Sequence, residues 1–288
     1  MTTFAGEGKS LVGYVRQLTS SDLRAAEDLL RADPVTNCFI DGRVRWAGLD
    51  PWRLGGDMWG YFDDDRLTSL VYAGANLVPV ATTPASRAAF ADRLRIMPRR
   101  CSSFVGPAEE VLDLWRLLEP AWGPAREVRP EQPLLVMDTD PVIEDDPLVR
   151  CAEPSELDLV VPACIDMFTE EVGISPVRGG AGTAYRGRIE ELVRSGRSFV
   201  RIVDGRIEFK AEVGAATPDV CQVQGVWVAR DLRGRGLSVP AMASVVRLAR
   251  ATISPVVSLY VNSYNTAARR AYAAVGFRPY GRFATVLF

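Results

Sequence analysis

The chain has 288 residues, a length that favours two domains over a single core. Apolar residues make up 48% and charged residues 24%, which is typical of a globular protein, and no apolar run is long enough to cross a membrane. A net charge of −2 gives no general attraction to nucleic acid, and the absence of histidine excludes a Ser-His-Asp triad, a Cys-His pair and every histidine-based metal site.

The N-terminal residues lack a basic region followed by an apolar stretch, so we expect no secretory signal and a cytoplasmic protein. The cysteines are odd in number, widely spaced and set among apolar neighbours, unlike the paired spacing of a zinc site. We interpret them as buried thiols and expect no metal. They are Cys38, Cys101, Cys151, Cys164 and Cys221.

A short pattern occurs twice in the chain. Residues 15–23 and 149–157 each hold Val-Arg and, at the same spacing, Ser-acid-Leu. The pattern predicts a strand followed by a helix that is capped by the serine and has an acid in its first turn. Further on, 65–67 and 205–207 each indicate a tight turn between antiparallel strands. We therefore expect two similar domains.

In the first half, a strand over 77–80 leads into a helix through residues 81–87, which contain no glycine. A phosphate-binding loop is therefore absent from this half. Three tryptophans that cluster in this half, at 46, 52 and 59, are interpreted as core residues.

A segment rich in proline and acids, residues 124–147, separates the halves. The apolar run 134–137 within it could be the last strand of the first domain. We predict a first domain over 1–137, a linker over 138–147 and a second domain over 148–288.

The second half predicts an α/β domain with a mixed sheet. Strands are expected at 148–152, 198–203, 206–215, 220–228, 256–261 and 282–288. Helices are expected at 155–168, 184–195, 238–251 and 265–274, with a glycine-rich loop at 173–183.

The strand at 220–228 runs into Arg-Asp-Leu-Arg-Gly-Arg-Gly-Leu-Ser and then directly into a helix. Gly234 and Gly236 allow a sharp turn with inward-facing N–H groups, and the helix N-terminus adds positive potential, so the loop can hold a diphosphate. Val239 stands where a dinucleotide fingerprint needs its third glycine, and the loop lacks the Gly-Lys-Ser/Thr that ends a P-loop. Alone, the loop leaves open a phosphate site or a solvated glycine-rich turn.

Residues 226–238 resemble the Arg/Gln-x-x-Gly-x-Gly/Ala motif of the GNAT superfamily of acyl-CoA N-acyltransferases, except that Ser238 replaces the final small residue. The segment 262–277 is similar to a second motif of that family, Asn-x-x-Ala, then Tyr, then Gly-Phe. The resemblance implies an α/β (α+β) fold of two tandem GNAT-like domains, each a mixed, mostly antiparallel sheet flanked by helices. The first half is similar to the degenerate domain of tandem GNAT proteins of the mycothiol synthase kind.

The resemblance also implies roles for individual residues. Acetyl-CoA is the expected co-substrate, and no metal is implied. Tyr272 is the expected general acid for the departing thiolate. The expected CoA-binding residues are Val226, Trp227, Val228, Arg233, Gly234, Arg235, Gly236, Leu237, Ser238, Asn262, Asn265 and Tyr272.

The general base is not identified by the resemblance. Gln222 and Gln224 lie on the cofactor strand where some family members have a glutamate, and an amide cannot accept a proton. Glu212, Glu171 or the adjacent Glu170 could substitute, or water could relay the proton.

The predicted reaction is transfer of an acetyl or short acyl group to a primary amine, on either a small molecule or a protein lysine. The alternative is a catalytically weak acyl-CoA-binding regulatory module. No nucleic acid or membrane is expected as a partner, and the sequence leaves the acceptor and the oligomeric state open.

Overall fold

The computed structural model describes residues 13–288. The chain forms two compact units, neither of which is continuous in sequence. The first takes in the described residues up to Asp33, Arg43–Pro130 and Phe283–Phe288, and the second takes in Pro34–Gly42 and Glu131–Arg282. Each unit thus contains a segment from the other half of the sequence. The domain ranges 1–137 and 148–288 remain a prediction.

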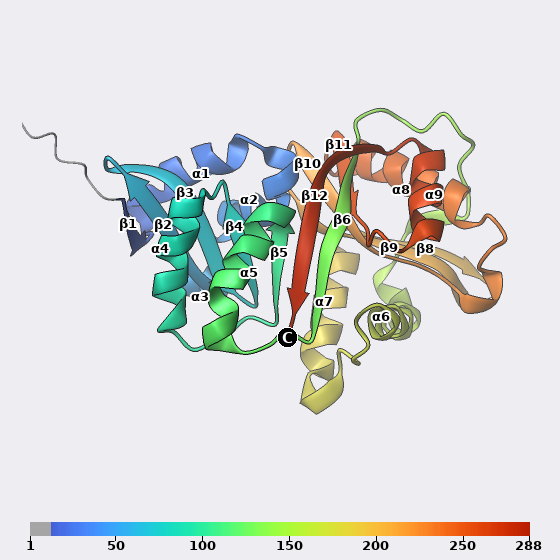
Figure 1. The fold of residues 1–288 in the computed structure, drawn as a ribbon. Helices are drawn as coiled ribbons and strands as arrows, with labels where there is room; N and C mark the ends of the chain where they lie inside the picture. Colours follow the sequence, from blue (N-terminus) through green and yellow to red (C-terminus); the bar gives the residue numbers. More distant parts are fainter. Residues whose placement is uncertain (1–12) are drawn as a thin grey trace, which may run out of the picture. The chain divides into compact units, whose positions relative to one another are not determined.

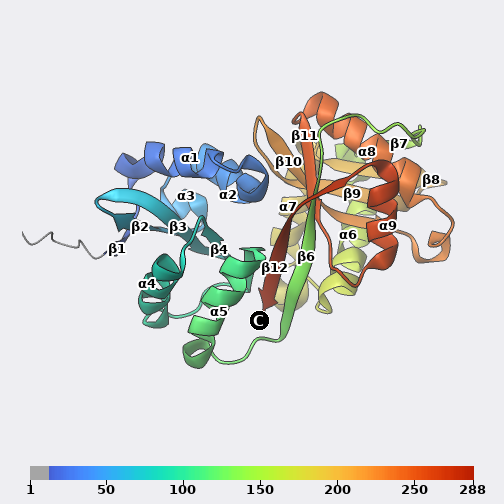
Figure 2. The ribbon, with the colours of Figure 1, turned by 45° about the horizontal axis from the view of Figure 1, so that its top comes forward.

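The first unit is a sheet with helices on both faces (Figures 1 and 2). The sheet is antiparallel except for the pair β4–β5. Its strands, in spatial order, are β1 (Tyr14–Gln17), β2 (Gly56–Asp63), β3 (Arg66–Gly74), β4 (Asn76–Val80), β5 (Ser103–Pro107) and the end of β12 (Arg278–Leu287). Its helices are α1 (Leu23–Arg31), the end of α2 (Pro34–Ala47), α3 (Pro51–Leu54), α4 (Pro84–Arg95) and α5 (Ala108–Trp122).

The second unit has the same plan. Its sheet is antiparallel except for the pair β10–β11. Its strands, in spatial order, are β6 (Glu127–Met137), β11 (Val256–Tyr260), β10 (Val220–Val228), β9 (Arg206–Ala216), β8 (Ser198–Val203) and β7 (Val149–Cys151). Its helices are α6 (Leu157–Val172), α7 (Gly182–Arg194), α8 (Ser238–Thr252) and α9 (Thr266–Val275).

Helices α8 and α9 cover one face of this second sheet, and α6 and α7 cover the other (Figure 1). Helix α8 buries one apolar stripe, since Met242, Val245, Val246 and Ala249 follow the helical spacing and are all 0% exposed. The predicted order of strands and helices in this half is therefore confirmed, with boundaries shifted by a few residues.

The closing strand of each sheet comes from an unexpected part of the sequence. Residues 134–137 of β6, considered above as a strand of the first domain, pair with β11 in the second unit. Residues 283–287 of β12, near the end of the chain, pair with β5 in the first unit. Sequence patterns give the strands but not these pairings, because a strand's partner is fixed only by tertiary contacts.

The repeated pattern forms the same ion pair in both units. Arg16 binds Asp22 through both guanidinium ends at 2.8 and 2.7 Å, and Arg150 binds Glu156 in the same way at 2.8 and 2.5 Å. Each acid also accepts the main-chain N–H of the residue three positions before it. The expected serine cap is therefore wrong. A short 3-10 turn precedes each of the helices α1 and α6, and its N-cap is Thr19 in one unit and Glu153 in the other, because the acid closes a capping box three residues later.

The two predicted tight turns also match. Asp64 and Asp65 have φ of 46° and 59°, and Asp204 and Gly205 have φ of 49° and 72°. These left-handed pairs are the backbone of a two-residue hairpin turn. The strands joined by each turn carry the same irregularity, since pairing shifts between Tyr61 and Phe62 in one unit and between 201 and 202 in the other.

Several other expectations concern burial. Four cysteines are buried free thiols, whereas Cys151 is only half-buried. Trp59 is buried, but Trp46 and Trp52 are 69% and 95% exposed, so assigning them to the core is wrong.

Within residues 13–288, no helix combines the length and apolar character needed to span a bilayer.

Candidate active site

Strand β10 has one paired edge and one edge that becomes free partway along. It pairs with β9 as far as Val228, but with β11 only over 220–222. Ala229 donates its N–H to Glu208 on the β9 side, so the main-chain groups of Val228 point to the other side. Beyond Gln222 this edge of β10 pairs with no strand among residues 13–288 and is available to an extended ligand, except that the carbonyl of Val228 accepts a hydrogen bond from Arg233.

A bulge interrupts β10 within this free stretch. Gln224 lies opposite Glu212 and Trp227 lies opposite Lys210, so residues 225 and 226 together face a single residue of β9. Gly225 has φ of 60°, a left-handed conformation that glycine adopts at little cost.

The loop after β10 presents a row of unused donors. Gly234 and Gly236 have φ of 75° and 82°. In the described chain, the N–H groups of residues 234–238 donate to no protein acceptor, and they lead into the first turn of α8. Consecutive free N–H groups at a helix N-terminus form a site for an anion.

The arginines of this loop differ in their partners. Arg230 and Arg233 both bind Glu170 of α6, at 2.8 and 2.6 Å. Burial raises the pKa of Glu170, but the two guanidinium groups outweigh it and hold that pKa below its usual value. Arg233 also donates to the carbonyl of Val228 at 2.9 Å. Arg235 is exposed and makes no ion pair among residues 13–288.

Tyr272 of α9 is buried, with 7% of its surface exposed, and its ring packs edge-on against Phe277. Burial raises the pKa of Tyr272 and the carboxylate of Glu171 raises it further, so the phenol keeps its proton at neutral pH. Its hydroxyl has no hydrogen-bond partner in the described part of the chain. Two residues singled out in the sequence, Tyr272 and Glu171, thus lie within electrostatic reach of each other.

The two asparagines of the second motif have structural partners. The side chain of Asn265 caps α9 by accepting the N–H of Ala268 at 3.1 Å, and that of Asn262 accepts from Gln132 at 2.8 Å. Each keeps an amide NH₂ group for a ligand, but its carbonyl oxygen is already used.

Glu212 is 4% exposed and lies in a cluster under the bulge. It binds Lys210 at 3.1 Å and accepts from Gln224 at 2.9 Å. Burial raises the pKa of Glu212, but Lys210 and Gln224 outweigh this effect and lower it. A paired carboxylate with a lowered pKa is a poor proton acceptor, so we do not retain Glu212 as the base.

Lys210 was missed in the sequence, although its position was informative. It is two residues from Glu212 on the same strand, so both side chains point to one face of the sheet. Gln222, on the neighbouring strand β10, is 8% exposed and lies opposite Ser258.

In the first unit, the N–H groups at the corresponding helix start, that of α4, already have acceptors within the protein. Glu110 accepts the N–H and the hydroxyl of Thr82 at 2.9 and 2.7 Å. Thr83 and Ser86 satisfy each other's N–H groups at the start of α4. No free row of donors like that at 234–238 occurs at this position.

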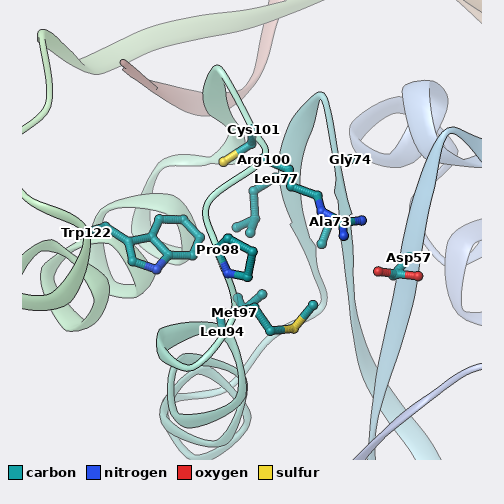
Figure 3. A pocket seen from close by; sticks show the side chains of 10 residues that line it. All are labelled: Asp57, Ala73, Gly74, Leu77, Leu94, Met97, Pro98, Arg100, Cys101 and Trp122. Atoms are coloured by element: carbon teal, nitrogen blue, oxygen red, sulfur yellow. The ribbon is translucent and has the colours of Figure 1, made fainter.

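The first unit does contain a small cavity of about 20 Å³, roughly the size of one water molecule (Figure 3). That volume cannot hold a nucleotide cofactor. Its lining residues are Asp57, Ala73, Gly74, Leu77, Leu94, Met97, Pro98, Arg100, Cys101 and Trp122.

Two family models match the chain. Residues 190–277 match one described as acetyltransferase (GNAT) family, and residues 56–160 match one described as a domain of unknown function (DUF4081). No curated protein matches the chain.

Several solved structures are similar over nearly the whole chain. A GCN5-related N-acetyltransferase from Sphaerobacter thermophilus has 17% identity and a TM-score of 0.61, covering 96% of this chain and 95% of its own. A tandem GNAT protein from the clavulanic acid biosynthesis pathway has 17% identity and a TM-score of 0.56, covering 95% and 98%. A GNAT-family acetyltransferase from Colwellia psychrerythraea has 12% identity and a TM-score of 0.57, covering 95% and 99%. At such low sequence identity, the structural similarity establishes the fold alone. It confirms the predicted architecture of two tandem units.

Proposed function

We propose that this chain is a GNAT-type acyltransferase that transfers an acetyl or other short acyl group from acetyl-CoA to a primary amine, in line with the family match over residues 190–277. The observation that supports this most directly is the free edge of β10 at 226–228 followed by the free N–H groups of 234–238. An extended arm with a diphosphate at its end needs these two features in this order.

The residues present fit that ligand. Val226 and Val228 would pair with the amide groups of the pantetheine arm, and the N–H groups of 234–238 would hold the diphosphate. Arg233 and Arg235 add positive charge, while Asn262 and Asn265 each offer an amide NH₂ group. Trp227 lies between the two pairing residues, and its ring packs toward α6 and α7.

Acetyl-CoA supplies an activated acyl group, whose carbonyl carbon is attacked by the amine while the thiolate departs. The free main-chain N–H of β10 near Val228 would stabilise the oxyanion. Tyr272, which keeps its proton at neutral pH, would donate it to the thiolate. Glu171, whose carboxylate raises the pKa of Tyr272, would be the base that binds the incoming ammonium and removes its proton.

The test uses acetyl-CoA with a panel of small-molecule amines and a lysine peptide, and it measures the release of free CoA thiol. We expect Tyr272→Phe to lower the transfer rate about a hundredfold or more, the loss typical of a missing general acid. Tyr14→Phe, a change in the first unit, is the matched control and should leave the rate unchanged.

Unchanged thiol release in Tyr272→Phe would remove that residue from the acid role. Binding of acetyl-CoA without transfer to any amine or peptide would favour the regulatory module instead, and would appear as a raised melting temperature. A small-molecule amine and a protein lysine remain distinct acceptors that the panel separates. A cytoplasmic location also remains a prediction.

A further inference from the structure

Two charged side chains are buried under the bulge of β10. Lys210 is 0% exposed and Glu212 is 4% exposed, and the lysine Nζ lies 3.1 Å from a carboxylate oxygen of the glutamate. Burying two charges is expensive, and an apolar pair of similar volume often gives equal or greater stability. Stability alone therefore does not account for the pair.

The pair lies directly against the bulge. A Cβ atom placed on Gly225 would lie 3.1 Å from the Nζ of Lys210 and 3.2 Å from the carboxyl carbon of Glu212. On the strand itself, Gln224 donates to the second oxygen of Glu212 at 2.9 Å. The pair thus packs against the bulge at Gly225, and Glu212 is hydrogen-bonded to Gln224, the residue before it.

The first unit offers an internal comparison. Its strand β4 ends at Val80, and Ala81 then adopts φ of 52°, close to the 60° of Gly225. Val80 lies opposite Leu70, just as Gln224 lies opposite Glu212. In the first unit an apolar residue is therefore sufficient at the position of Glu212.

The segment after the left-handed residue also differs between the units. In the first unit, helix α4 begins at Pro84, directly after residues 82 and 83. In the second unit, β10 continues through 226–228 before the glycine loop, and Lys210 lies opposite Trp227 in this continuation. The buried Lys210 and Glu212 thus lie beside residues 226–228, the part of the strand that has no counterpart in the first unit.

We propose that Lys210 and Glu212 are positioning residues of the acyltransferase site. They hold the bulge at Gly225 in place, and the bulge directs the main chain of 226–228 toward the thioester arm of CoA. This inference rests on the proposed function. It assigns the pair to the arm and not to the diphosphate, which is held by the separate loop at 234–238.

The experiment replaces both charges in the full chain and compares two ligands by calorimetry. The variant is Lys210→Met with Glu212→Leu, which puts a leucine where the first unit has Leu70. The ligands are acetyl-CoA and adenosine 3′,5′-bisphosphate, which has phosphates but no arm. We expect acetyl-CoA affinity to fall about tenfold, the loss of roughly one main-chain hydrogen bond, with bisphosphate affinity unchanged.

The matched control is Arg150→Met with Glu156→Leu, which removes an ion pair of the same unit away from β10. It should leave the ratio of the two affinities as in the wild type. If the Lys210/Glu212 variant does not fold, Gln224→Met removes the hydrogen bond between Glu212 and the bulged strand instead. Gln224 is exposed, so this substitution leaves the buried pair intact.

An unchanged ratio of affinities in the Lys210/Glu212 variant would overturn the inference. An equal loss of both ligands with a lower melting temperature would also overturn it, since that result indicates a structural role only. Wild-type protein that binds neither ligand would refute the proposed function itself, and it is recognised before any variant is made.

Discussion

Helices α4 and α8 follow equivalent strands in the two units, but their first turns are built in opposite ways. At α4 the donors are used within the unit, by the carboxylate of Glu110 and by the reciprocal bonds of Thr83 and Ser86. At α8 the N–H groups of residues 234–238 donate to no acceptor among residues 13–288. The same fold can therefore satisfy a helix start internally or keep it for a ligand.

The length of the preceding segment explains the difference. Two residues separate the left-handed Ala81 from α4, which brings Thr82 within reach of Glu110. Residues 226–237 separate Gly225 from α8, and they supply both the free strand edge and the glycine loop. We therefore expect ligand binding in the second unit, where this longer connection occurs.

The largest effect is expected from a substitution in the glycine loop, which the first unit lacks. Gly236→Val places a β-branched residue at φ of 82° and turns the neighbouring N–H groups away from a common point. Strain of about 1–3 kcal/mol should lower acetyl-CoA affinity about tenfold or more, as measured by calorimetry. Its control, Ala81→Gly in the first unit, relieves a φ of 52° and should not change the affinity. Equal affinity in Gly236→Val would show that the loop is not the binding site.

A smaller effect is expected at the filled helix start. Glu110→Ala leaves the donors of Thr82 without their acceptor and should lower the free energy of unfolding by about 1–3 kcal/mol in denaturant titrations. Acetyl-CoA binding by the folded variant should be unchanged. A loss of acetyl-CoA affinity in Glu110→Ala would contradict the contrast between the two units, because it would show that the first unit contributes to binding.

The same residue gives a pH dependence. Burial raises the pKa of Glu110 in the folded state. Such an acid stabilises the fold most below its unfolded pKa, and this contribution is lost as the pH rises through the folded pKa. The stability difference between wild type and Glu110→Ala should therefore shrink from acidic to neutral pH.

The smallest effect tests the feature that the units share. Hydrogen bonds from Arg16 lower the pKa of Asp22 from 3.8 to about 2, despite an opposing effect of burial. A depressed pKa gives stability that is present above pH 3.8 and is lost as the pH falls to about 2. Asp22→Asn should cost about 1 kcal/mol at neutral pH, since Arg16 is partly exposed, and should lose less stability on acidification.

Glu156→Gln is the counterpart in the second unit. Its pKa is also lowered, chiefly by hydrogen bonds from Arg150 and against an opposing effect of burial. Acid unfolding of the two variants should respond in the same direction. Opposite responses would show that the repeat is a similarity of sequence without a shared energetic role.

Much of this molecule follows from local sequence. The alternation and period of apolar residues predicted the strands and helices of the second half, and paired turn residues predicted both hairpins. The free N–H groups at 234–238 follow from glycine and helix geometry, which involve only neighbouring residues. Tyr272 and Glu171 were both singled out, but only the structure brings them near each other.

Other features depend on residues far apart in the chain. The pairing of β6 with β11 and of β12 with β5 depends on which edges meet, which no local pattern encodes. The use of Asn265 as a helix cap follows from where α9 begins. Glu212 looked like a candidate base in the sequence, but burial beside Lys210 makes it a fixed partner of that lysine. Local sequence thus determined the elements and the glycine loop, whereas long-range packing decided which charged groups are buried and paired, and burial and pairing shift their pKa values.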